Sequence, residues 1–282
     1  MKIFEREPKR FFSFGCSFTQ YWWPTWANII ALDLDVPFYN YGRPGVGNQF
    51  IFNAVMQADN YFQFDNNDLV IVQWTNTARE DRWIDGCWQA LGNIYTQESN
   101  YYDSNFVRKY VNNINSELHD FAVIKAVYEF LTSKKCQFHF LKMVDFEQED
   151  QFKTEKYNPD VINKLISSQY QQYLDFILPS FYAILWNDSV EVRRNKDRNI
   201  HKNFIDGHPD VMEHSIFLNT VFDEHNFKDK TVKTVSGYHE KITKQLSLQT
   251  ERYVKMLGSG LPIWRMLTDD FHFNQSEQIE MI

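Results

Sequence analysis

Three residues have the types that nucleophilic acyl chemistry requires. Ser17 stands in the segment Gly15-Cys16-Ser17-Phe18-Thr19, directly after a short apolar run. A serine hydroxyl becomes an effective nucleophile when a histidine accepts its proton. His208 follows Asp206 by two residues, and a carboxylate there can keep the second ring nitrogen of the histidine protonated. These residues make Ser17 a candidate nucleophile, His208 its candidate base and Asp206 the candidate orienting acid.

Two further loops contain hydrogen-bond donors for the oxyanion that such an attack creates. The loop Asn40–Asn48 contains three glycines, and a glycine there offers a backbone N–H with no side chain in the way. Asn76, in Trp74–Arg79, offers a side-chain amide. With the Ser17 N–H, they predict an oxyanion hole. Each feature by itself also has a structural interpretation: a helix cap at the serine, a plain turn at the glycine, and an asparagine bonded to loop backbone.

Alternating strands and helices are expected to position these loops. Short apolar segments predict strands at 11–14, 38–41, 69–72 and 138–144. Helical periodicity predicts helices at 26–34, 50–62, 118–131, 161–177, 211–222 and 238–257. This alternation predicts an α/β fold, a three-layer α/β/α sandwich around a mostly parallel, flavodoxin-like sheet. In such sheets the site lies beyond the carboxyl ends of the strands, which is where the loops of Ser17, Gly45 and Asn76 are expected.

The length favours one domain with elaborated loops. The chain has 282 residues, 43% of them hydrophobic, enough for a large core. We expect a single domain over 1–282, with insertions at about 79–115 and 145–203 and a C-terminal helical extension at about 225–282. The strands at 11–14 and 69–72 are expected in the centre of the sheet because their apolar runs suit burial on both faces.

The order of these loops resembles the block order of the SGNH (GDSL-like) hydrolase superfamily. The first block is Gly15-Cys16-Ser17, the second contains Gly45, the third is Trp74-Thr75-Asn76-Thr77, and the last is Asp206-Gly207-His208. The chain departs from the family pattern at three points. Cys16 replaces an aspartate, Trp74 replaces a glycine, and the last block is one residue shorter than the common spacing.

The resemblance implies a serine esterase that works through an acyl-enzyme on Ser17, and it selects Gly45 as the oxyanion donor of the second loop. Short acyl esters are expected as substrates, with acetyl groups on a glycan favoured. We assign Trp22, Trp23, Trp74 and Arg79 to substrate contacts, since aromatic faces stack on sugar rings. Two alternatives stay open. One is an O-acyltransferase on polysaccharide, and the other is a non-catalytic binding or structural module with a degenerate site.

Composition argues against several other partners. A formal net charge of −8 disfavours a nucleic-acid backbone. No apolar stretch approaches the roughly 20 residues of a membrane helix, and the charged N-terminus lacks a signal-peptide core, so we expect a cytoplasmic protein without a membrane partner. The expected partner is a small-molecule or glycan ester, and the oligomeric state is left open.

We expect neither a metal nor another cofactor. The three cysteines have no paired zinc-ligand spacing, and we interpret Cys16 as a small apolar filler. A second set of candidate ligands lies near the last block but matches no known metal-ligand spacing: His201, Asp206, His208, Asp210 and His214.

Overall fold

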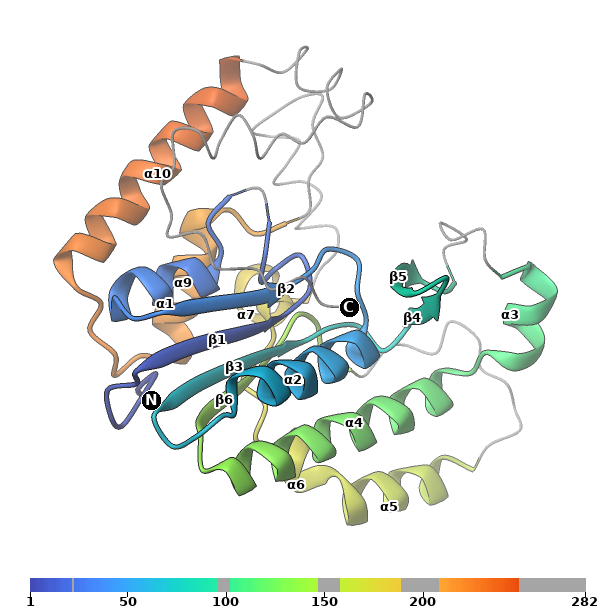
Figure 1. Ribbon diagram of the computed structural model, residues 1–282. Helices are drawn as coiled ribbons and strands as arrows, with labels where there is room; N and C mark the ends of the chain where they lie inside the picture. The colour runs from blue at the N-terminus through green and yellow to red at the C-terminus, as the bar shows by residue number, and fades with distance from the viewer. Residues whose placement is uncertain (22, 96–101, 147–157, 189–207, 249–282) are drawn as a thin grey trace.

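The centre of the molecule is a parallel sheet of four strands in the order β2-β1-β3-β6 (Figure 1). The computed structural model describes residues 1–21, 23–95, 102–146, 158–188 and 208–248. The strands are β1 (Arg10–Gly15), β2 (Phe38–Gly42), β3 (Asp68–Trp74) and β6 (Gln137–Lys142). The two strands expected in the centre, β1 and β3, are central, and every residue of β3 is buried.

Aromatic side chains fix the register between β1 and β2. Phe12 pairs with Tyr39 and Phe14 with Tyr41, and each pair of rings stacks at about 5 Å between centroids. At the amino end of the sheet, Arg10 in β1 bonds the buried Asp68 of β3 at 2.7 Å. Because all four strands run parallel, their carboxyl ends meet at one edge, where the predicted site loops begin.

Helices cover both faces of this sheet, which confirms the three-layer α/β/α architecture (Figure 1). One layer contains α2 (Asn48–Phe62), α4 (Asn113–Lys134), α5 (Pro159–Gln169) and α6 (Gln171–Leu174). The other contains α1 (Trp26–Leu34), α7 (Phe181–Trp186), α9 (Val211–Val221) and α10 (Asp229–Leu248).

The expected insertion at 79–115 contains a β-hairpin of β4 (Arg79–Ile84) and β5 (Cys87–Asn93), then α3 (Ser104–Tyr110) and the start of α4. The turn is Asp85-Gly86, with φ of 52° and 80°. Asp-Gly is a preferred sequence for the two-residue turns in which both residues have positive φ. The sequence therefore contained a signal for this hairpin that the prediction did not use.

Some boundaries differ from the predictions. The helix expected at 161–177 is interrupted at Tyr170, which caps α5 and precedes α6. The last predicted helix begins earlier, at Asp229, because its first turns pack against α1 and α9. The short helix α7 was not predicted, since its apolar run has no clear periodicity. Residues 189–203, the last part of the insertion expected at about 145–203, lie outside the described residues.

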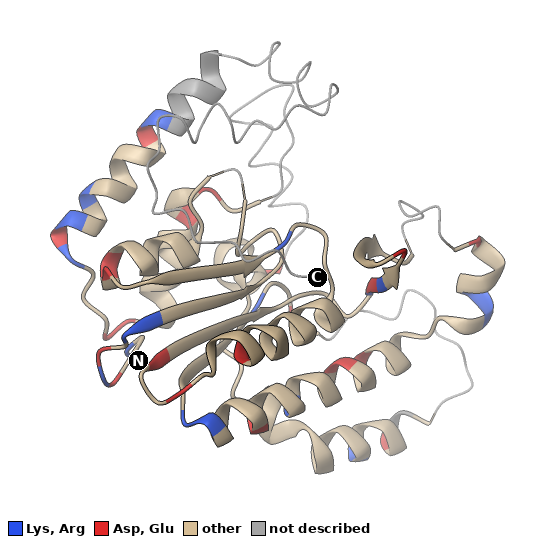
Figure 2. Cartoon of the chain, in the orientation of Figure 1, with Lys and Arg blue, Asp and Glu red and all other residues tan. Residues whose placement is uncertain are grey.

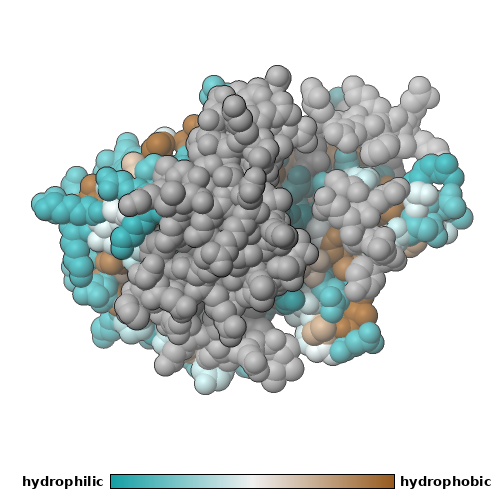
Figure 3. Space-filling view, turned by 90° about the horizontal axis from the view of Figure 1, so that it is seen from above, coloured by the Kyte–Doolittle hydropathy of each residue, from teal (hydrophilic) through white to brown (hydrophobic). Residues whose placement is uncertain are grey.

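Charged residues lie on the outer helices and at the strand ends, while the middle of the sheet is uncharged (Figure 2). From above, the described surface mixes hydrophilic and hydrophobic residues (Figure 3). Within the described ranges, no helix has both the length and the apolar character needed to cross a membrane.

Candidate active site

The loop that carries Ser17 begins where β1 ends, at Gly15. A side chain at this position would place its Cβ 2.1 Å from the Thr19 Oγ1, so the tight turn requires glycine. The Thr19 N–H donates to the Cys16 carbonyl at 2.9 Å and closes the turn around Ser17. Ser17 is 4% exposed, so this residue is largely buried and does not lie on an open surface.

Buried polar side chains from three elements hold this loop. The Thr19 hydroxyl donates to Gln73 Oε1 in β3 at 2.6 Å. The Thr19 carbonyl accepts from Asn40 Nδ2 in β2 at 3.1 Å and from the Thr25 hydroxyl at 2.7 Å. The backbone after the serine is therefore fixed to both neighbouring strands and to the start of α1.

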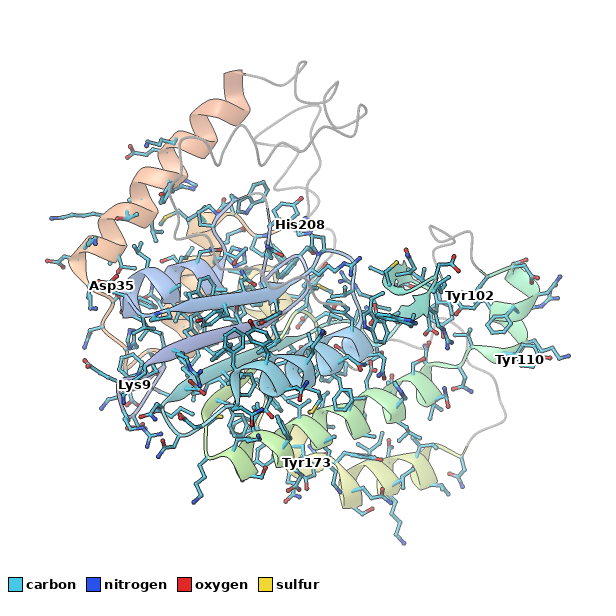
Figure 4. The ribbon with its side chains drawn as sticks, in the orientation of Figure 1. Lys9, Asp35, Tyr102, Tyr110, Tyr173 and His208 are labelled. Atoms are coloured by element: carbon cyan, nitrogen blue, oxygen red, sulfur yellow. The ribbon has the colours of Figure 1, made fainter. Side chains whose placement is uncertain are left out.

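His208 lies against this loop, although the two segments are far apart in sequence. Its Nε2 is 2.8 Å from the Ser17 Oγ. The imidazole stacks on Tyr21, with ring centroids 3.9 Å apart, and meets the edge of Phe18 at 5.5 Å. In Figure 4, His208 lies far from Lys9, which precedes β1 at the opposite end of the sheet. The aromatic residues Phe18 and Tyr21, which follow the serine, thus form the packing surface for the histidine ring.

The segment after His208 is also anchored. Trp23 Nε1 donates to the Pro209 carbonyl at 2.7 Å. Asp210 then caps α9 by accepting from the Glu213 N–H at 2.9 Å, and Glu213 bonds back to the Asp210 N–H. These contacts leave little freedom for the histidine backbone. The predicted acid, Asp206, lies outside the described residues.

The loop that contains Gly45 begins where β2 ends and lies beside the serine loop. The Arg43 N–H donates to the Gly15 carbonyl at 3.0 Å and joins the two loops. Gly45 has φ of +84°, a conformation that favours glycine.

The third predicted donor, Asn76, follows β3 in the same edge of the sheet. Its Oδ1 accepts from the Ala78 N–H at 2.7 Å. This bond occupies the amide oxygen, so the Nδ2 group is the part of the side chain left to donate.

Two predicted substrate contacts are core residues instead. Trp74 has no exposed surface and packs its ring edge-to-face on Phe140 at 5.4 Å. Trp23 is 6% exposed and supports the Pro209 backbone. Large aromatic side chains with this little exposed surface cannot stack on a sugar, so we assign both to packing. Trp22, the remaining tryptophan of the prediction, lies outside the described residues.

Arg79, also predicted to contact substrate, is bonded to protein groups. Its Nη1 donates to the Val46 carbonyl at 3.0 Å, and its Nη2 lies 3.7 Å from the Met143 sulfur. The sulfur of the fully buried Cys16 is 3.9 Å from the same Met143 sulfur. Cys16 therefore fills space beneath the site, as its interpretation as a small apolar filler expected.

Two buried polar residues at this edge were missed by the sequence reasoning. Asp81 accepts hydrogen bonds from the Gly47 and Phe50 N–H groups. Asn48 bonds the backbone of Thr75 with both ends of its amide. Glycine at the start of a helix signals a missing cap, but the sequence cannot say which distant residue supplies the acceptor.

Burial is the largest influence on the Asp81 carboxyl group. It raises the pKa of Asp81 to about 6, although the hydrogen bonds from the two N–H groups act in the opposite direction. Within the described parts of the chain, no group of three or more His, Cys, Asp or Glu side chains is arranged to hold a metal ion.

No protein-family model and no curated protein sequence matches the chain. Its structure is distantly similar to several solved structures, among them the following three. A member of the lipolytic protein G-D-S-L family from Veillonella parvula is 14% identical over 77% of this chain and 99% of its own, with a TM-score of 0.38. An acetylxylan esterase from Geobacillus stearothermophilus is 14% identical over 81% and 98%, with a TM-score of 0.39. An acetyl xylan esterase from Butyrivibrio proteoclasticus is 11% identical over 78% and 64%, with a TM-score of 0.40. Likenesses this distant carry no functional assignment.

Proposed function

We propose that this protein is a serine esterase of the SGNH type, with Ser17 as nucleophile and His208 as general base. The observation that carries the proposal is the 2.8 Å contact between His208 Nε2 and Ser17 Oγ at the carboxyl edge of a parallel sheet. A serine and a histidine in hydrogen-bond contact are the signature of an activated nucleophile. The family resemblance of the four loops points to the same chemistry.

The reaction has two steps, acylation of Ser17 and hydrolysis of the acyl-enzyme. Ser17 Oγ attacks the ester carbonyl carbon while its proton passes to His208 Nε2, and the carbonyl oxygen becomes an oxyanion. The Ser17 N–H, the Gly45 N–H and the Asn76 amide are the proposed donors to that oxyanion. Collapse of the intermediate breaks the bond to the alcohol, which leaves with the proton from His208. Water then repeats the sequence on the acyl-enzyme, releasing the acid and restoring Ser17. Asp206 is the proposed partner for the other nitrogen of His208.

The substrate we propose is a short acyl ester, with acetyl groups on a glycan favoured. The support for a short acyl group is the aromatic packing around the nucleophile: Phe18 and Tyr21 pack against the ring of His208, and Trp23 packs against Tyr21. Ser17 itself is 4% exposed, which suits a small group better than a long chain. A clear preference for long-chain lipid esters would contradict this part of the proposal.

Turnover of p-nitrophenyl acetate tests the proposal. Ser17→Ala and His208→Ala should each abolish turnover while circular dichroism stays unchanged. Ser13→Ala is the matched control, because Ser13 is buried in β1, the strand that leads to Ser17, and its hydroxyl has no hydrogen-bond partner among the described residues. The proposal fails if esterase activity survives both site substitutions.

A further inference from the structure

The N-terminus of α2 lacks a cap of its own. The residue at the cap position is Gly47, which has no side chain to accept from the first N–H groups of the helix. The acceptor comes instead from Asp81 in β4. Its two carboxylate oxygens lie 2.8 and 3.0 Å from the Gly47 nitrogen, and one of them is 2.9 Å from the Phe50 nitrogen. A carboxylate at a helix N-terminus is favourable because it meets the positive end of the helix dipole.

The close approach of the hairpin explains the glycine at the cap. A Cβ on residue 47 would lie 2.9 Å from the Arg79 carbonyl oxygen and 2.9 Å from Asp81 Oδ2. The hairpin therefore occupies the space that a capping side chain would need. In Figure 1 the β4–β5 hairpin lies beyond the end of α2 that follows β2.

Two more hydrogen bonds link the hairpin to the loop between β2 and α2. Arg79 Nη1 donates to the Val46 carbonyl at 3.0 Å, and Arg43 Nη2 donates to the Trp88 carbonyl at 3.0 Å. On its other side, the same loop is bonded to the end of β1 through the Arg43 N–H and the Gly15 carbonyl. These bonds anchor Arg43, Val46 and Gly47, which lie on both sides of Gly45 in the chain. The direction of the Gly45 N–H therefore depends on these anchored neighbours.

We infer that the β4–β5 hairpin is a clamp that positions the Gly45 N–H for the oxyanion, with Asp81 as its principal positioning residue. This inference rests on the proposed esterase function and extends it to a part of the chain outside the family-like blocks. Asp81 acts through the backbone of residues 47 and 50 and does not touch the substrate. A displacement of about 1 Å in a catalytic group can cost about 10²-fold in rate, so a loosened clamp should be visible in kcat.

Asp81→Asn tests the clamp. Whichever carboxylate oxygen the amide nitrogen replaces, that nitrogen comes to lie 2.8 or 3.0 Å from the Gly47 nitrogen, so a donor faces the Gly47 N–H and the cap is weakened. We expect kcat for p-nitrophenyl acetate to fall about 10- to 100-fold, with KM changed less than about threefold. Each rate is divided by the concentration of active sites, which is measured as the fraction of protein molecules that react covalently with a fluorophosphonate.

Asp85→Asn is the matched control. Asp85 is exposed at the turn of the same hairpin, loses the same charge, and has a positive φ that asparagine tolerates. It should keep the wild-type kcat and KM. Should Asp81→Asn not fold, Arg79→Met removes one bond of the clamp, to Val46, and should lower kcat about 5- to 10-fold without raising KM.

Two results would overturn the proposal that the hairpin positions Gly45. The first is a wild-type kcat in folded Asp81→Asn. The second is a loss of kcat in this variant that disappears when the rate is expressed per labelled site. A raised KM with unchanged kcat in Arg79→Met would instead assign that side chain to substrate. Full activity in Ser17→Ala would overturn the esterase proposal itself, whereas an inactive Ser17→Ala beside a fully active Asp81→Asn would overturn the clamp alone.

Discussion

The molecule contains a second group of aspartate, histidine and hydroxyl side chains, far from Ser17. Asp33, near the end of α1, accepts from His225 Nε2 at 3.0 Å and from the Thr231 hydroxyl at 2.7 Å. It also accepts from the Lys228 N–H at 2.8 Å. Like the site at the sheet edge, this group joins segments about two hundred residues apart in sequence, and its residue types would satisfy a simple search for a catalytic triad.

The two groups differ in which side chains are hydrogen-bonded to each other. At the sheet edge, the histidine nitrogen faces the Ser17 hydroxyl, so a proton can pass to the ring. In the second group, the hydroxyl and the histidine both bond to the carboxylate, and the hydroxyl proton is directed at Asp33 instead of at the histidine. The second group therefore fastens the start of α10 to α1. Residue types alone do not make a site; the order of their hydrogen bonds does.

The largest expected effect separates the two groups by activity. Ser17→Ala and His208→Ala should lower kcat/KM by about 10³-fold or more, because the nucleophile and its base act as one unit. His225→Ala and Thr231→Val should leave kcat per folded molecule within about twofold, since neither meets the substrate. Steady-state kinetics with p-nitrophenyl acetate provide the measurement. Comparable losses in both groups would remove the distinction.

The next effect concerns the proposed oxyanion donors. Asn76→Ala should lower kcat by about 10²–10³-fold, the usual result of removing one such donor. KM should change little, because the bond strengthens only as charge develops on the oxygen. A variant with the full esterase rate would exclude Asn76 from the oxyanion hole.

The second group should control stability instead of rate. Asp33→Ala leaves His225, Thr231 and the Lys228 N–H without their shared acceptor, and should lower the free energy of unfolding by about 2–4 kcal/mol. Urea denaturation followed by tryptophan fluorescence measures the change. An unchanged midpoint would show that the group does not hold α10 in place.

A smaller effect should appear at acidic pH. Burial alone would raise the pKa of Asp33, but the hydrogen bonds from His225, Lys228 and Thr231 outweigh it and hold the pKa below its ordinary value of 3.8. The folded state thus binds this proton less readily than the unfolded chain does, so the stabilisation is complete above about pH 4 and lost as the pH falls through the folded pKa. Unfolding curves of wild type and Asp33→Asn should therefore converge on acidification. Curves that stay parallel would contradict this.

Much of the fold was predictable from local patterns. The uninterrupted apolar run of β3 indicated a buried parallel strand, and α1 was predicted with its observed bounds because its apolar spacing is regular. The break at Tyr170 and the short α7 were not predictable in this way. Both depend on packing between elements, which periodicity does not record.

The site was predictable only in part, for a similar reason. Ser17, Gly45 and Asn76 could be named because they follow strand ends, and His208 because it completes a family-like order of loops. The supports around them could not. The hydrogen bond from Trp23 to Pro209 joins residues 186 positions apart, and the cap of α2 by Asp81 joins residues 34 positions apart. The local sequence around Trp23 or Asp81 does not indicate these partners. The stack of Tyr21 on His208 is equally long-range.

Trapping of the acyl-enzyme tests the assignment of Ser17 as the nucleophile. The protein is mixed with p-nitrophenyl acetate, quenched in acid within the first turnovers, digested and examined by mass spectrometry. We predict one acetyl group on the peptide that contains Ser17, absent in His208→Ala and present in Ser13→Ala. Acetylation on another residue, or labelling of Ser17 that persists undiminished in His208→Ala, would contradict it.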